Sequence, residues 1–236
     1  MVRTQQSQAS TGMKLTSHPA WLDEDLYPFD SHYIDLDGNL VHYIDEGTGP
    51  TLLFLHAAPL WSFQYRTIIK VLRNRFRCIA LDYPGFGLSV AAPDYHNTLS
   101  DNSQLVERFI SELKLTDITL VGHDTGCAIG LGVVGRHPDW FKGLAISNSF
   151  AWPFEDYPKL YRPLRFIGSP AGRFLIVNFN VLIKQTGRVL AGGRLSDAEL
   201  KAYHGRSSIA PRGITSTICS GRSRTATTTS PICVRD

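Results

Sequence analysis

The fold of this chain is decided by residues 117–130, which read Asp-Ile-Thr-Leu-Val-Gly-His-Asp-Thr-Gly-Cys-Ala-Ile-Gly. Ile118, Leu120 and Val121 form a short apolar run of the length expected for a β-strand that is buried on both faces. A turn bounded by two glycines follows at once, and small residues then lead into a segment that ends at His137-Pro138. A strand, a sharp turn and a helix are therefore expected to follow one another without a linker.

The turn Gly122-His123-Asp124-Thr125-Gly126 has the spacing of a nucleophile held on a strained backbone, where neighbouring side chains must be small. Gly122 and Gly126 meet that need, because glycine has no Cβ that would collide with the strand or the helix. The central Asp124 is ionised at neutral pH and can attack carbon directly to give an ester. This chemistry favours substitution at an sp³ carbon that carries a leaving group. The alternative is that Asp124 only caps the helix that follows it.

Strands and helices are expected to alternate between residues 51 and 147. The expected elements are a hairpin around Asp37-Gly38, buried strands at Thr51–His56, Phe76–Leu81 and Leu144–Ile146, a helix over Trp61–Leu72 and a helix capped by Ser100. Such alternation predicts an α/β fold with a mostly parallel sheet that is covered by helices on both faces.

Composition divides the chain into four parts. We expect a flexible leader over residues 1–26, the core over 27–151, a helical lid over 152–205 and a low-complexity, disordered tail over 206–236. The tail holds six serines, six threonines and five arginines and shows no amphipathic period. Its five arginines and one acid give a net charge of +4, so the other residues sum to −1 and the formal charge of +3 does not indicate a nucleic-acid partner.

The overall composition favours a cytoplasmic globular protein. No run approaches the ~20 apolar residues of a membrane span, so no membrane partner is expected. The four cysteines have neither paired C-x-x-C spacing nor the density of a disulfide scaffold. Because there is no metal-ligand cluster, phosphate loop or dinucleotide fingerprint, we expect no metal and no cofactor. The oligomeric state stays open.

Several motifs together make the chain resemble the haloalkane dehalogenase branch of the α/β-hydrolases and its epoxide hydrolase neighbours, over about residues 27–205. They are Asp45-Glu46-Gly47, the segment from His56 to Phe63, Tyr65-Arg66, the segment from Asp82 to Ser89, and Gly122 to Gly126, with His137-Pro138 and Trp152-Pro153 in the matching places. The resemblance implies an α/β-hydrolase fold with a helical lid, in which the last two strands of the sheet would be missing from this chain.

The resemblance also implies a reaction, namely cleavage of a carbon–halogen bond in a small apolar substrate. Asp124 would attack the carbon and form a covalent alkyl ester. The backbone N–H groups of Ala58 and Thr125 would form the oxyanion hole for hydrolysis of that ester. The alternative for Ala58-Pro59 is a simple tight loop after a strand.

The chain departs from the family at three places. The dehalogenases hold the departing halide with a tryptophan after the nucleophile and often an asparagine or glutamate in the preceding loop, but Thr125 and Ala58 stand here. Asn148 occupies one of the two places of the triad acid. The base histidine of the family lies near the C-terminus, whereas the last histidine of this chain is His204. Activity is therefore expected to be impaired.

Two other histidines, His56 and His123, flank the expected site, but the resemblance makes both structural. From about Gly205 the chain reads as out-of-frame sequence or an alternative terminus joined to an ordinary hydrolase. Without the base, we expect the ester to form once and then to persist.

Two alternative functions stay open. The first is epoxide hydrolysis by the same aspartate, with the lid tyrosines Tyr157, Tyr161 and Tyr203 as donors to the ring oxygen, although lid tyrosines more often pack. The second is a catalytically inactive, truncated hydrolase in which Leu144–Ile146 becomes an exposed apolar edge.

Overall fold

The computed structural model describes residues 13–15, 18–150, 166 and 195–204. Within these residues a seven-stranded sheet has the order β1-β2-β3-β5-β4-β6-β7. Its strands are β1 (Met13–Leu15), β2 (Ser31–Leu36), β3 (Asn39–Glu46), β4 (Thr51–Leu55), β5 (Arg77–Leu81), β6 (Ile118–His123) and β7 (Phe141–Ser147). The pairings from β5 through β4 and β6 to β7 are parallel, and those from β1 to β5 are antiparallel. Only β1 and β3 thus run in the opposite direction to the other strands, which confirms a mostly parallel sheet.

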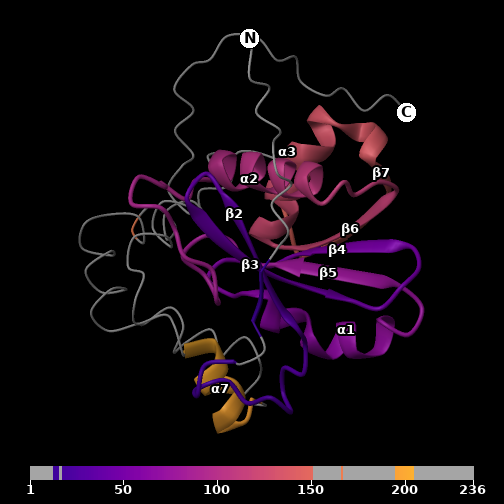
Figure 1. Cartoon of the computed structure of the whole chain (residues 1–236). Coiled ribbons are helices and arrows are strands. Elements are labelled where there is room, and N and C mark those ends of the chain that lie inside the picture. Colours follow the sequence, from indigo (N-terminus) through magenta and orange to yellow (C-terminus); the bar gives the residue numbers. More distant parts are fainter. Residues whose placement is uncertain (1–12, 16–17, 151–165, 167–194, 205–236) are drawn as a thin grey trace, which may run out of the picture.

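Helices cover both faces of this sheet. They are α1 (Arg66–Leu72) with the preceding 3₁₀ turn η1 (Ser62–Tyr65), α2 (Leu99–Glu112), α3 (Thr125–Arg136), the 3₁₀ turn η2 (Pro138–Trp140) and α7 (Asp197–His204). Figure 1 shows α2 and α3 on one face and α1 on the other. The predicted α/β architecture is confirmed.

Strand β4 shows why its sequence is a continuous apolar run. Leu53 and Leu55 belong to the apolar cluster that contains the buried faces of α2 and α3. Leu52 and Phe54 belong to the second cluster, which contains Ile69 of α1. Because successive side chains of a strand point to opposite faces, a strand covered on both sides must be apolar at every position.

The predicted hairpin joins β2 and β3. Asp37 and Gly38 have φ values of 56° and 77°, the left-handed conformation that a two-residue type I′ turn requires at both central positions. The Gly38 N–H donates to the Asp35 carboxylate at 2.8 Å. The turn chemistry therefore sets the register Leu36↔Asn39 that starts the antiparallel pair.

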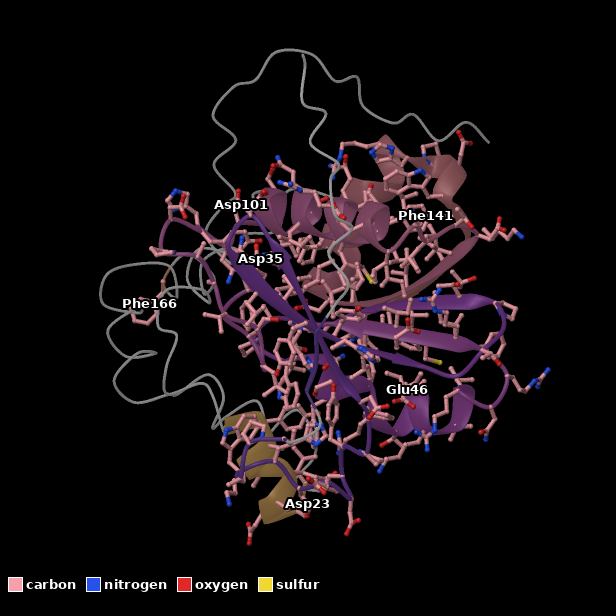
Figure 2. All side chains as sticks on the ribbon, viewed as in Figure 1. Asp23, Asp35, Glu46, Asp101, Phe141 and Phe166 are labelled. Carbon is pink, nitrogen blue, oxygen red and sulfur yellow. The ribbon has the colours of Figure 1, made fainter. Side chains whose placement is uncertain are left out.

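Two helix predictions need correction. The N-cap of α2 is Thr98 rather than Ser100, because Thr98 forms a capping box with Asp101, which lies at the start of α2 (Figure 2). The helix predicted over Trp61–Leu72 is divided into η1 and α1. The Ser62 N–H donates to the Asp82 carboxylate at 2.8 Å, which fixes the start of this segment against a distant loop.

The folded part begins before the predicted boundary at residue 27. Within the predicted leader, β1 pairs with β2, and Leu22 is buried. Trp21 packs edge-on against Trp61. Apolar side chains thus tie this segment to the core. The four-part division of the chain and the cytoplasmic location stay predictions.

Strand β7 lies at one edge of the sheet that the described residues form. Leu144 and Ile146 are 45% and 50% exposed, as the prediction of an apolar edge at this strand requires. No described helix is long and apolar enough to cross a membrane. Most of the predicted lid, at 152–165, 167–194 and 205, and the predicted tail lie outside the described residues.

Candidate active site

The turn between β6 and α3 is the predicted elbow. Asp124 stands between the two elements with φ 51° and ψ −122°. A Cβ at Gly126 would lie 2.1 Å from the Leu55 carbonyl oxygen, and a Cβ at Gly122 would lie 2.8 Å from Cys127 Sγ. Both glycines are therefore required by close approach of neighbouring atoms, as the sequence predicted. The Asp124 N–H donates to the Ser147 carbonyl at 3.1 Å, which ties the elbow to β7.

The carboxylate of Asp124 is half-buried and is not used for structure by the described residues. Asp124 holds the N-cap position of α3, but its side chain makes no capping hydrogen bond to the helix. No hydrogen bond or ion pair of the described residues reaches this carboxylate. The backbone instead carries the local contacts, since Ser149 Oγ donates to the Asp124 carbonyl at 2.8 Å.

The structure brings Ala58 and Thr125 together. The Ala58 N–H donates to Thr125 Oγ1 at 2.7 Å, although the two residues are 67 positions apart in the chain. The Thr125 side chain is only 8% exposed. One of the two predicted oxyanion donors is therefore occupied by a hydroxyl group of the other residue, an interaction that the sequence did not predict.

Both histidines beside the elbow are hydrogen-bonded to neighbouring groups. His56 is buried, its Nδ1–H donates to the Ala57 carbonyl at 3.0 Å, and its Nε2 accepts the Tyr83 N–H at 3.1 Å. Burial lowers the pKa of the His56 imidazole, which favours the neutral form. His123 Nδ1 lies 3.0 Å from Ser147 Oγ, whose proton goes to the Gly122 carbonyl. Within the described residues, no hydrogen bond joins a histidine to Asp124.

A Ser-His-Asp arrangement lies elsewhere and was missed by the sequence reasoning. Ser31 Oγ is 3.0 Å from His42 Nε2, and His42 Nδ1 is 2.8 Å from Asp82 Oδ2. The three residues are 1%, 0% and 0% exposed, so no substrate reaches them. Asp82 also accepts the Ser62 and Leu88 N–H groups at 2.8 and 2.9 Å. The signal was the Asp82–Ser89 motif, which this network holds in place.

The described part of the predicted lid, α7, is attached to the core next to η1. Trp61 Nε1 donates to the Ala202 carbonyl at 3.2 Å, and Arg66 pairs with Glu199. Arg66 also donates to the Tyr203 hydroxyl at 3.3 Å. Burial raises the pKa of Tyr203, whose ring packs edge-on against Phe63. Tyr203 is therefore a packing residue.

The remaining candidates are Tyr157, Tyr161, Asn148 and a metal site. Tyr157 and Tyr161 lie outside the described residues. Asn148 is exposed directly after β7 with φ 45° and presents an amide where a carboxylate was considered. Among the described residues there is no group of three or more His, Cys, Asp or Glu side chains arranged to hold a metal ion.

A parallel strand, a residue with left-handed φ and a helix packed through two obligatory glycines define the nucleophile elbow of an α/β-hydrolase. A family model described as "alpha/beta hydrolase fold" matches residues 50–208. The chain belongs to this family.

The similar proteins include haloalkane dehalogenases. Haloalkane dehalogenase 2 of Mycobacterium tuberculosis strain H37Rv is 36% identical over 163 residues, which cover 69% of this chain and 57% of that protein. The crystal structure of haloalkane dehalogenase DbeA from Bradyrhizobium elkani USDA94 superposes with a TM-score of 0.70 at 26% identity, covering 81% of this chain and 68% of that one. The predicted resemblance to the haloalkane dehalogenase branch is confirmed.

A further relative carries a different name. The cis-3-alkyl-4-alkyloxetan-2-one decarboxylase of Shewanella oneidensis is 38% identical over 134 residues, which cover 56% of this chain and 42% of that protein. The chain thus spans about half the length of the curated relatives described here, 57% of the dehalogenase and 42% of the decarboxylase.

Proposed function

We propose that this chain carries out the alkylation step of a haloalkane dehalogenase-like hydrolase on small apolar substrates. The observation that carries the proposal is the Asp124 carboxylate, which stands on the elbow at φ 51° without a hydrogen bond or ion pair among the described residues. A carboxylate that contributes nothing to the described local structure, at a position where the backbone is strained, is typical of a nucleophile.

The step is a substitution at carbon. An Asp124 carboxylate oxygen forms a bond to the carbon, the carbon–halogen bond breaks, and its electron pair leaves with the halide. The product is an alkyl ester of Asp124. Because the carboxylate is already ionised at neutral pH, this step needs no base.

Cleavage of the ester is the slower half of the reaction in this chain. It requires an activated water and donors for the oxyanion that forms on the ester carbonyl. Both ring nitrogens of His56 are engaged, and no hydrogen bond of the described residues joins His56 or His123 to Asp124. The alkyl ester therefore accumulates instead of turning over.

The identity of the leaving group is set by Thr125 and Ala58, which stand where the resemblance expects halide donors. The Ala58 N–H is taken by Thr125 Oγ1, which leaves the single Thr125 O–H of this pair as a donor to the halide. Good leaving groups such as bromide and iodide should therefore react faster than chloride.

Intact mass spectrometry after incubation with 1-bromobutane tests the proposal. The parent chain should gain one butyl group, which peptide mapping locates at Asp124, while Asp124→Asn should react at least about a thousandfold more slowly. Sustained bromide release without an adduct would contradict accumulation of the ester. The absence of both adduct and bromide, in a chain that melts cooperatively, would contradict alkylation itself.

Epoxide opening is the second candidate, with the same carboxylate as the nucleophile. It is favoured by the Shewanella relative, whose name gives a four-membered oxygen ring as the substrate. Styrene oxide adds its whole mass to the protein because the ring oxygen stays attached, so the two reactions are distinguished in one assay. A faster adduct with styrene oxide than with 1-bromobutane would favour this candidate.

The third alternative is an inactive hydrolase that associates through the exposed edge at β7. Size-exclusion chromatography and thermal melting decide this point. A monomer peak and a cooperative melt count against it, and aggregation with no adduct from either reagent supports it.

A further inference from the structure

The Thr125 hydroxyl occupies the place that an anionic oxygen would take beside Ala58. Donors of an oxyanion hole lie 2.7–3.1 Å from the position of the oxyanion. Thr125 Oγ1 lies 2.7 Å from the Ala58 nitrogen. No hydrogen bond or ion pair of the described residues reaches the Asp124 carboxylate, so its oxygens do not take this N–H.

The hydrogen bond is formed in a protected place. Thr125 is 8% exposed at the first position of α3, and its backbone is fixed by the elbow. The Ala58 loop is fixed as well, since the Ala57 N–H donates to Gln64 Oε1 at 3.1 Å and the Leu60 N–H donates to the Ala57 carbonyl at 2.7 Å. The donor and the acceptor are thus held together by two independently anchored segments, which strengthens the contact.

We propose that the Thr125 hydroxyl blocks the oxyanion site by accepting the Ala58 N–H, and that it thereby slows cleavage of the Asp124 ester. Thr125 is then a positioning residue, and we call its blocking hydroxyl the plug. The proposal rests on the proposed function of Asp124 for its effect on the reaction. The plug itself rests only on the contact between Thr125 and Ala58.

The plug acts differently on the two steps. During alkylation the negative charge moves from the carboxylate to the leaving group, so the oxyanion donors are not required. During ester cleavage a nucleophile adds to Cγ of residue 124, and the charge develops on the ester carbonyl oxygen. The Ala58 N–H serves that oxygen only after the Thr125 hydroxyl has rotated away from it. Breaking this hydrogen bond therefore adds to the barrier of the second step alone.

Hydroxylamine makes the second step measurable without a base. Its nitrogen adds to Cγ of the butyl ester, the bond from Cγ to the butoxy oxygen breaks, and butanol leaves with a proton from nitrogen. Residue 124 becomes a hydroxamate, and the loss of butanol is read by intact mass. The rate is expressed per molecule of preformed adduct, so it does not depend on how fast each variant was alkylated.

Thr125→Val removes the acceptor and keeps the branched shape, whereas Thr125→Ser keeps the hydroxyl and serves as the matched control. We expect the Val variant to lose its butyl group about fivefold faster than the parent, the factor that one neutral hydrogen bond contributes. The Ser variant should resemble the parent. An unchanged rate in the Val variant, or a slower one, would overturn the plug, and a slower rate would show that the hydroxyl is itself a donor.

Amide hydrogen exchange at Ala58, measured on protein labelled with [¹⁵N]alanine, tests the plug without any reaction. The Ala58 N–H should exchange at least about fivefold faster in Thr125→Val than in the parent and in Thr125→Ser. Equal protection in all three proteins overturns the proposal. If no protein forms an adduct, the proposed function fails, and exchange at Ala58 still decides the plug.

Discussion

Asp82 and Asp124 both stand directly after a parallel strand of the sheet, β5 and β6, yet their surroundings are opposite. Asp82 is fully buried and accepts hydrogen bonds from His42, Ser62 and Leu88. Asp124 is half-buried, and its carboxylate accepts none among the described residues. The same side chain at equivalent strand ends is therefore held by hydrogen bonds in one loop, whereas in the next we propose that it is the nucleophile. The number of donors around it decides which.

The difference follows from the cost of burying charge. A carboxylate removed from water destabilises the fold unless donors replace its hydration. Asp82 has such donors on both oxygens, including two backbone N–H groups. Asp124 remains in partial contact with solvent and does not require them.

Substituting the two aspartates by asparagine should separate their roles most strongly. Asp82→Asn removes the charged partner of a buried network, so we expect the free energy of unfolding to fall by about 3–5 kcal/mol. Asp124→Asn should change it by about 0.5 kcal/mol or less, because asparagine tolerates φ 51° and no described hydrogen bond of the side chain is lost. Urea unfolding followed by circular dichroism measures both.

For reactivity the order of the two variants should be reversed, so that Asp124→Asn is the more strongly impaired. If Asp82→Asn keeps its fold at low temperature, it should still form the butyl adduct, whereas Asp124→Asn should not. A stable Asp82→Asn variant combined with a strongly destabilised Asp124→Asn variant would contradict the assignment of the two roles.

A methyl group added at the elbow should have the next largest effect on the free energy of unfolding. In Gly126→Ala the added Cβ would lie 2.1 Å from the Leu55 carbonyl oxygen, so backbone must move, and we expect a loss of about 2–3 kcal/mol. Gly135→Ala in the same helix is the matched control, since nothing lies within 4 Å of its added Cβ. This variant should gain up to about 1 kcal/mol from helix propensity. Thermal melts of both variants check the prediction, and equal shifts would show that the elbow is not tightly packed.

Lowering the pH should have the smallest and most selective effect on the free energy of unfolding. Burial raises the pKa of Asp82, but the charge of the His42 imidazole and its hydrogen bond, together with the Leu88 N–H, hold the pKa below its usual value of 3.8. A carboxyl group whose pKa is lower in the folded than in the unfolded state stabilises fully above about pH 4, and this contribution is lost as the pH falls through the folded pKa.

The stability difference between the parent and Asp82→Asn should therefore be constant from pH 7 to about pH 5 and shrink below about pH 4. Urea midpoints measured at several pH values give this difference directly. A difference that grows on acidification would mean that the pKa of Asp82 is raised rather than lowered in the folded protein.

Several features of the fold could be predicted from short stretches of sequence. The hairpin at Asp37-Gly38, the buried strands and the elbow depend on residues within a few positions of one another. The sequence predicted Ser100 as the cap of α2, whereas Thr98 is the cap because it forms the reciprocal hydrogen bonds with Asp101. The role of Tyr203 was left open because its partner Arg66 is 137 residues away.

The sequence by itself determined the α/β fold and the strained turn at Asp124, because glycines on both sides of that residue impose a local constraint that a reader can recognise. Only the tertiary structure decided that Asp82 is hydrogen-bonded to His42, 40 residues away, and that the Thr125 hydroxyl accepts the N–H of Ala58, 67 residues away. The physical reason is that a hydrogen bond depends on where two atoms lie in space. The pattern of residues along the chain fixes that only for near neighbours.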